Sequence, residues 1–335
     1  MKAIIQQLVE TAAPSGYETA MRELVRSLAA PYADSIEVDT LGNLVVRKGS
    51  RQDGGLRIMV AAHMDEIGIL ASYIDEKGFV RFTRNGGVRA ANCLGGRVRF
   101  LNGVQGIIGS EKLDNPEKTP TFEQLFIDVG ATSRDDCPVK TGDVAVFERP
   151  FLDLGKRLVA KALDDRVGVA VMLDVLSKLK DTPHEVLFVF TVQEEVGTRG
   201  AIAAAYHLEP EIGLSVDVTL TGDTPRGSKM EVELGKGPAI KIRDAGMLSD
   251  PRIIRWMNDT AAHENIPTQR EILEGGSTDA RSIQISRAGV PVGSLSIPCR
   301  YVHSPSEMVD FSDVQHASAL LLALLGRPVS LEQEG

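Results

Sequence analysis

The stretch from Val186 to Gly200, VLFVFTVQEEVGTRG, limits the possible fold more than any other part of the chain. It begins with a nearly unbroken apolar run, which is typical of a central strand in a sheet that helices cover on both faces. Two adjacent carboxylates, Glu194 and Glu195, follow this run. Open α/β sheets place ligand-binding groups at the carboxyl ends of their strands. The stretch therefore predicts an α/β protein with a polar site at one edge of its sheet.

Glu194 and Glu195 cannot have the same role, because successive side chains of an extended chain point in different directions. One carboxylate can bind a metal ion while the other handles a proton. A pair of glutamates in a loop is, however, more often simply solvated. The rest of the chain has to distinguish these alternatives.

Another apolar run, Leu56 to Ala62, leads directly to His63-Met64-Asp65. Residues i and i+2 of a strand lie on the same side, so His63 and Asp65 are expected to be neighbours. A metal-bound histidine usually donates its second ring N–H to a carboxylate. His63 as a ligand oriented by Asp65 is one interpretation, and a histidine hydrogen-bonded at a sheet edge is the other.

Polar residues follow three further apolar runs in the same way. Asp164 and Asp165 open a predicted helix, where aspartates usually act as caps. Asp217 and His303 each follow a further apolar run. The repeated placement after predicted strands favours one shared site over separate coincidences.

The segment from Ile67 to Glu148 has a different pattern, with short predicted strands between Gly-, Asn- and Asp-rich turns. This pattern is typical of a small β-barrel or sandwich. Because the α/β pattern resumes afterwards, the segment is predicted to be an inserted domain. The expected organisation is a catalytic domain of residues 1–66 and 149–335, with residues 67–148 inserted into it.

The composition narrows the expected partners and compartment. A formal net charge of −9 argues against nucleic acid or an anionic membrane as the main partner. The three cysteines are odd in number and widely spaced, which suits a reducing cytoplasm. The N-terminus lacks the apolar core of a signal peptide, and no apolar run is long enough to span a membrane. We therefore predict a cytoplasmic protein.

The residues that follow predicted strands form a candidate set of metal ligands. They are His63, Asp164, Glu195, Asp217 and His303. Nitrogen and oxygen donors of this kind suit zinc, cobalt or manganese. Five protein ligands are too many for one catalytic zinc ion, whereas two ions bridged by an aspartate and a water explain the number. Two divalent cations would also neutralise carboxylates that otherwise force one another to hold protons.

Six motifs resemble, in this order, the motif set of the tetrahedral (TET) metalloaminopeptidases, a family that includes glutamyl aminopeptidases and cellulase M-like proteins. They are HMDEIG at 63–68, ALDDR at 162–166, QEEVG at 193–197, VDV at 216–218, GSTDA at 276–280 and YVHS at 301–304. The resemblance covers nearly the whole chain, including the position of the insertion. It implies a zinc-exopeptidase-like α/β fold, with a mixed sheet flanked by helices and interrupted by a small β-barrel.

The resemblance also implies an activity and roles for the site residues. It implies an aminopeptidase that releases N-terminal residues from short peptides, with two divalent ions per subunit, Zn²⁺ or Co²⁺. The implied ligands are His63, Asp164, Glu195, Asp217 and His303. Asp164 is the implied bridge, rather than Asp165, because a cis peptide bond follows the bridging aspartate in related metallopeptidases. Glu194 is the implied general base and then acid for a metal-bridging water, and Asp65 is the implied orienting partner.

The resemblance further implies that the insertion mediates dimer contacts and that dimers assemble into a dodecamer. The chain departs from the common family pattern at Arg281 and Ser282, where small residues are expected, and this leaves the side-chain preference open. Arg243, Asp244 and Arg281 are candidates for a specificity pocket. Two alternatives remain. A dinuclear-metal carboxypeptidase or N-acyl deacylase would need a cation for the substrate carboxylate, whereas a non-enzymatic metal-binding assembly protein would not need Glu194.

Overall fold

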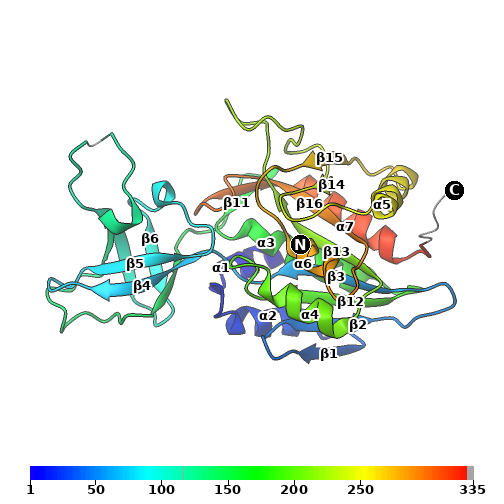
Figure 1. Ribbon diagram of the computed structural model, residues 1–335, viewed down its shortest axis with the longest axis horizontal. Helices are drawn as coiled ribbons and strands as arrows, with labels where there is room; N and C mark the ends of the chain where they lie inside the picture. Colours follow the sequence, from blue (N-terminus) through cyan, green and yellow to red (C-terminus); the bar gives the residue numbers. More distant parts are fainter. Residues whose placement is uncertain (116, 330–335) are drawn as a thin grey trace.

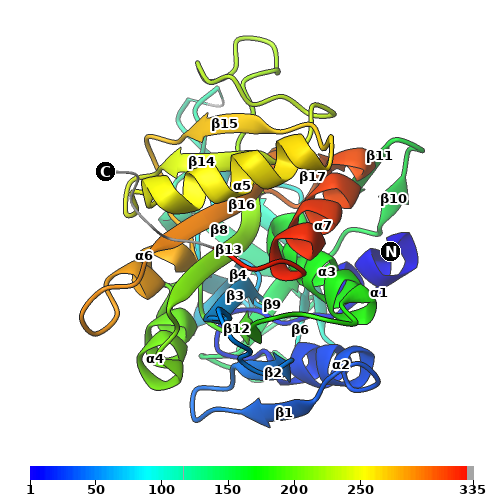
Figure 2. The same cartoon turned by 90° about the vertical axis from the view of Figure 1, so that its right-hand side faces the viewer.

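An eleven-stranded mixed sheet forms the larger part of the molecule (Figures 1 and 2). The computed structural model describes residues 1–115 and 117–329. The main strand order is β1 (Ser35–Val38), β2 (Leu44–Lys48), β12 (Glu185–Thr191), β3 (Arg57–His63), β13 (Ile212–Thr219), β16 (Val292–Arg300), β17 (Glu307–Asp310), β11 (Arg157–Ala160) and β10 (Leu152–Asp153). Two further strands lie off this order: β14 (Ala239–Arg243) pairs with β16 and with β15 (Gln269–Ile272). Neighbours among the central strands β12, β3, β13 and β16 run parallel. Their carboxyl ends therefore meet at one edge of the sheet.

Alternate residues of the central strands pack into two apolar cores, one on each face of the sheet. Ile58 and Val60 face one core, whereas Met59 and Ala61 face the other. The first core contains residues of α1 (Lys2–Glu10), α2 (Thr19–Ala29), α3 (Leu163–Lys178), α5 (Pro251–His263) and α7 (Phe311–Leu325), and the second contains residues of α4 (Arg199–Leu208) and α6 (Asp279–Gln284). Coverage on both faces explains why β3 and β12 are apolar runs without alternation.

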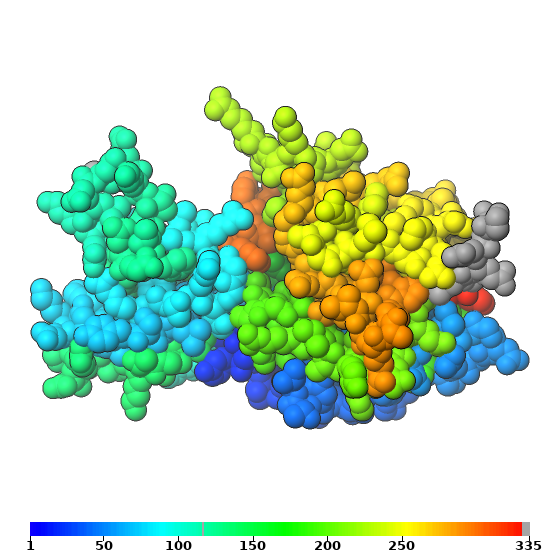
Figure 3. All heavy atoms as spheres, in the orientation of Figure 1, coloured from blue at the N-terminus to red at the C-terminus, as the bar shows by residue number. Residues whose placement is uncertain are grey.

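A closed β-barrel follows β3 and has a core of its own, which includes Phe82 and Phe100. Its strands, in order around the barrel, are β4 (Gly68–Ile74), β5 (Val80–Asn85), β8 (Leu125–Asp128), β7 (Gln105–Ser110), β6 (Arg97–Phe100) and β9 (Val144–Phe147), with short 3₁₀ turns η1 (Ala90–Asn92) and η2 (Phe122–Gln124). Figure 3 shows this segment as a lobe beside the larger body. The structure thus confirms the predicted fold class, an α/β sheet interrupted by a barrel. Among the described residues, no helix is both long and apolar enough to cross a membrane.

Candidate active site

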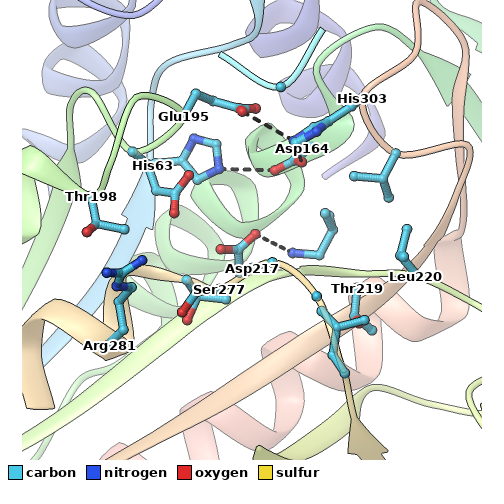
Figure 4. A pocket seen from close by; sticks show the side chains of 18 of the residues that line it. His63, Asp164, Glu195, Thr198, Asp217, Thr219, Leu220, Ser277, Arg281 and His303 are labelled. Carbon is cyan, nitrogen blue, oxygen red and sulfur yellow. Dashed lines mark hydrogen bonds and ion pairs between the residues drawn. The ribbon is translucent and has the colours of Figure 1, made fainter. Parts of the chain in front are cut away.

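A cavity of about 490 Å³ opens where the parallel strands end (Figure 4). Its lining includes most of the residues that the sequence singles out, namely His63, Asp164, Glu194, Glu195, Asp217 and His303. Asp65 does not line the cavity, but its carboxylate is 3.5 Å from Nδ1 of the His63 ring. The structure therefore brings together side chains from five separate segments of the chain.

One group of possible ligands, the inner triad, consists of His63, Asp164 and Asp217. One ligand atom from each lies within 4.8 Å of the others, and all three residues are buried. The Nε2 atom of His63 is 3.0 Å from Oδ1 of Asp164. His63 ends β3, and the parallel register that pairs Ala61 with Ser215 places Asp217 level with it. The sheet itself therefore sets the spacing between two of the three side chains.

A second group, the outer triad, consists of Asp164, Glu195 and His303, with ligand atoms also within 4.8 Å of one another. The Nε2 atom of His303 is 3.2 Å from Oε2 of Glu195 and 3.4 Å from Oδ2 of Asp164. The side chain of Glu195 is only 4% exposed, whereas that of His303 is 32% exposed. Asp164 belongs to both triads, because Oδ1 faces His63 and Oδ2 faces His303 (Figure 4).

The two adjacent aspartates have different surroundings. The peptide bond between Asp164 and Asp165 is cis. Asp164 faces the cavity, whereas Asp165 accepts hydrogen bonds from the backbone N–H groups of His63 (3.2 Å) and Gly168 (3.1 Å). Asp165 thus caps the start of α3 and ties it to β3. Both roles that the sequence left open therefore occur: Asp165 caps the helix and Asp164 lines the cavity.

Glu307 is a site residue that the sequence analysis did not identify. Its carboxylate accepts hydrogen bonds from the backbone N–H of Asp164 and of His303, both at 2.9 Å. The side chain is buried, and it fixes two members of the outer triad relative to each other. No local sequence signal marks this role, because both donors are backbone groups.

Asp65 connects the end of β3 with the two adjacent glutamates. Its Oδ1 accepts from the N–H of Glu194 (3.0 Å), and its Oδ2 accepts from the N–H of Glu195 (3.2 Å) and from Oγ of Ser15 (2.6 Å). The ring Nδ1 of His63 lies 3.5 Å from Oδ1 and 3.2 Å from the backbone oxygen of Asp65. Asp65 therefore orients both the histidine and the glutamate turn, and Ser15 is a further residue that the sequence analysis missed.

The electrostatics of the cluster fit bound cations. Burial raises the pKa of Asp217 to about 8, and the nearby Asp164 adds to the rise. Burial also raises the pKa of Glu194 well above its usual value. Burial lowers the pKa of His303, but hydrogen bonds with Asp164 and Glu195 outweigh this and raise it to about 11. A donor set that binds protons this strongly, with nitrogen and oxygen ligands converging, suits divalent cations.

Three cationic side chains also line the cavity: Arg89, Lys241 and Arg281. Lys241 is buried and forms ion pairs with Glu271 at 3.0 Å and with Asp244 at 3.7 Å. Arg89 and Arg281 are exposed, and neither has an ion-pair partner within the part of the chain that the structure describes. Of the candidates for a specificity pocket, Arg281 thus lies at the cavity. Asp244 does not line the cavity, but it is buried and accepts a hydrogen bond from Oγ of the lining residue Ser277 at 3.0 Å. Arg243 does not line the cavity either.

Known proteins resemble this chain in both sequence and fold. The model of the M42 glutamyl aminopeptidase family matches residues 42–320. The lysyl aminopeptidase of Pyrococcus furiosus is 33% identical, over 96% of each chain. An aminopeptidase structure from the archaeon Desulfurococcus kamchatkensis is 40% identical with a TM-score of 0.93, over 97% of this chain and 94% of that one.

A further structural relative is the Pyrococcus horikoshii TET1 peptidase, described as assembling into a tetrahedron or a large octahedral shell. It is 32% identical with a TM-score of 0.87, over 97% of this chain and 98% of that one. These relatives confirm the resemblance to TET aminopeptidases that the motifs indicated. The chain is therefore an aminopeptidase, and it belongs to the M42 glutamyl aminopeptidase family.

Proposed function

We propose that this aminopeptidase works with two divalent cations, zinc or cobalt, one at each triad. The inner cation would be held by His63 and Asp217, the outer one by Glu195 and His303, and Asp164 would bridge them. The observation that carries this proposal is the position of Asp164, which directs one carboxylate oxygen toward each triad. When bound, the cations would polarise the peptide carbonyl and lower the pKa of water in the site.

Glu194 is the proposed general base and acid. Its side chain lines the cavity but belongs to neither triad, so it remains available for proton transfer. Its raised pKa suits a carboxylate that takes a proton at neutral pH and gives it back. The Oδ1 atom of Asp65 accepts a hydrogen bond from the backbone N–H of Glu194 at 3.0 Å, which positions the glutamate. In the proposed reaction Glu194 takes the proton of the attacking water and then protonates the leaving amine.

The proposed restriction to N-terminal residues comes from binding of the free α-amino group of the substrate, either to a cation or to an acidic side chain of the cavity. Four carboxylates line the cavity, those of Asp164, Glu194, Glu195 and Asp217, and a carboxylate that no cation neutralises would attract the protonated amine of a free N-terminus. A peptide with a blocked N-terminus lacks this charge. The proposed substrates are therefore short peptides with a free α-amino group.

We also propose a role for the barrel in assembly. Residues 67–148 would form a dimerisation domain, inserted into a catalytic domain of residues 1–66 and 149–335, and dimers would assemble into a dodecamer. Large apolar side chains of this segment are exposed, among them Tyr73, Leu94 and Ile107. Contact between copies would bury them. The proposed compartment is the cytoplasm, which suits three free cysteines.

Substitution of Glu194 by Gln tests the proposal. The variant should keep its bound metal, because Glu194 is not a ligand, and should lose about 10²- to 10⁴-fold in kcat. Glu76→Gln is a matched control, since Glu76 is exposed on the barrel. Metal content and hydrolysis of one short peptide, with and without chelator, are the measurements. If turnover survives in Glu194→Gln, the base is assigned wrongly.

The same peptide with an acetylated N-terminus separates the alternatives. We expect no cleavage of the acetylated form. If it is cleaved, the site is that of a carboxypeptidase or N-acyl deacylase, for which Arg89 or Arg281 would supply the cation that binds a substrate carboxylate. Metal uptake without cleavage of either form would favour a non-catalytic metal-binding protein.

A further inference from the structure

The barrel contributes directly to the wall of the active site. Strand β5 ends at Asn85, and the chain then runs past the outer triad before it turns into η1, which ends at Asn92. We call residues 85–92 the strap. Arg89, within the strap, lines the active-site cavity together with Glu195 and His303, whose side chains point toward one another in Figure 4.

Two glycines of the strap lie against ligands of the outer triad. A Cβ atom added to Gly86 would be 3.1 Å from Cβ and 3.3 Å from Oε2 of the Glu195 side chain. A Cβ atom added to Gly87 would overlap Nδ1 and Cε1 of the His303 ring. The strap backbone therefore forms the surface against which both side chains rest, and a larger residue at position 87 would displace the ring.

Hydrogen bonds join the strap to the segments that carry the outer triad. The Nδ2 atom of Asn92 donates to the backbone oxygen of His303 at 3.1 Å. On its other side, the N–H of His303 donates to Glu307 at 2.9 Å. His303 has a left-handed backbone with φ of 61°, which is uncommon for a residue with a side chain. Bonds on both sides of His303 hold it in this conformation.

A second connection runs from the strap to the glutamate turn. The Nδ2 atom of Asn85 donates to the backbone oxygen of Ser15 at 2.9 Å. Oγ of Ser15 in turn donates to Asp65 at 2.6 Å, and Asp65 accepts the N–H groups of Glu194 and Glu195. The strap thus contacts both loops of the outer triad. Asp65 is also close to His63, but His63 and Asp217 of the inner triad lie on strands of the main sheet, and Asn92 and Gly87 contact only His303 among the members of the triads.

We infer that the strap positions the outer triad, with Asn92 and Gly87 as positioning residues for His303, so that the barrel is part of the active site as well as a separate folding unit. This inference rests on the proposed two-metal function. It assigns the barrel an effect on one triad only. A change in the strap should weaken cation binding at the outer triad and leave the inner triad unaffected.

Cobalt titration of the metal-free full-length chain tests this selectivity. Visible absorption of Co²⁺ reports its coordination, so binding is measured without reference to activity. Wild type should take up two equivalents. In Asn92→Ala and in Gly87→Ala, the affinity for one Co²⁺ equivalent should fall by about tenfold, which is at the lower end of what supporting residues of metal sites contribute. The affinity for the other equivalent should stay as in wild type.

Asn102→Ala provides the matched control. Asn102 lies in a barrel turn outside the strap, and its Nδ2 donates to the backbone oxygen of Pro138 at 3.4 Å and not to a residue of either triad. This variant should bind both equivalents as wild type does. If Gly87→Ala does not fold, Asn92→Ala decides the question alone.

The outcomes separate the inference from the proposed function. If Asn92→Ala binds both equivalents like wild type, or if both equivalents weaken equally, the inference is wrong and the two-metal proposal stands. If wild type itself takes up no cobalt, the two-metal proposal fails and the inference fails with it. Weakening of a single equivalent in the strap variant, with none in Asn102→Ala, supports the inference.

Discussion

The inner and outer triads share Asp164 but are built in different ways. His63 and Asp217 of the inner triad lie on parallel strands whose register sets their spacing. Glu195 and His303 of the outer triad lie in loops beyond strand ends. The buried carboxylate of Asp65 holds Glu195, and that of Glu307, together with the barrel, holds His303. The comparison shows that the sheet positions one half of the site, whereas the other half is positioned by contacts between segments that are distant in the chain.

The two triads also differ in exposure. The inner triad is buried, while the side chain of His303 is 32% exposed. Charges interact more strongly where water is excluded. We therefore expect the inner triad to bind its cation more tightly and the outer triad to exchange its cation more readily.

The largest effect should come from the residue that the triads share. Asp164→Asn removes a negative charge from both, so both cations should be lost and kcat/KM should fall by at least about 10⁴-fold. Elemental analysis of metal content and peptide hydrolysis measure this. Asp53→Asn, at an exposed position, serves as the control. Retention of one full equivalent in Asp164→Asn would contradict a shared ligand.

A pair of single substitutions tests whether the triads are separable. Asp217→Asn should remove the inner cation, and Glu195→Gln should remove the outer one, each leaving the other bound. We expect a loss of about 10³-fold in kcat/KM for Asp217→Asn and about 10²-fold for Glu195→Gln, because the buried site contributes more. Cobalt titration and kinetics of both variants give the result. Equal losses would show that the difference in burial has no functional effect.

The pH dependence of cation binding gives a smaller effect with a defined sign. In the metal-free chain the pKa of His303 is raised to about 11 and that of Asp217 to about 8, so both groups hold protons at neutral pH. A cation must displace these protons, and its affinity should rise by about tenfold per pH unit for each proton released. Cobalt titrations between about pH 6 and about pH 8 measure the slope.

The two groups distinguish the triads in the same experiment. Because Asp217→Asn should not bind the inner cation, the remaining slope in that variant should come from the outer triad alone. Proton release on mixing with cobalt, followed with a pH indicator, is an independent measurement. An affinity that does not change with pH would show that neither group is protonated in the metal-free chain.

The smallest effect should come from Ser15. Ser15→Ala leaves one oxygen of the buried Asp65 without its shortest hydrogen bond, which should lower the free energy of unfolding by about 1 to 2 kcal/mol. The glutamate turn would be held less firmly, so kcat should fall several-fold. Denaturant unfolding and peptide kinetics measure both. Ser27→Ala, on the exposed face of α2, is the control, and a similar loss there would remove any special role for Ser15.

The sequence predicted the sheet and its polar edge because these depend on local patterns. Apolar runs such as Val186 to Val192 identify buried strands, and polar residues that follow them identify the edge. The pattern could not show which of Asp164 and Asp165 faces the cavity, since adjacent residues occupy equivalent places in the sequence. The family resemblance implied Asp164 as the bridging ligand, and in the structure Asp164, not Asp165, lines the cavity.

The supporting residues could not be predicted from local patterns. Glu307, Ser15 and Asn92 act on backbone groups of segments far away in the chain. A backbone donor or acceptor has no residue-type signature, so nothing in the sequence indicates its partner. Only the folded arrangement of the sheet and the barrel brings these groups together.

The position of the barrel between β3 and β10 also affects the order in which the protein can fold. The barrel strands pair within one continuous segment, whereas the triads require β3, β13 and the chain beyond β16 to be in place. Short-range contacts form before long-range ones, and domains complete early in synthesis can fold first. A chain still on the ribosome can therefore carry a folded barrel before His303 has been made, so the barrel can be in place before the outer triad is complete.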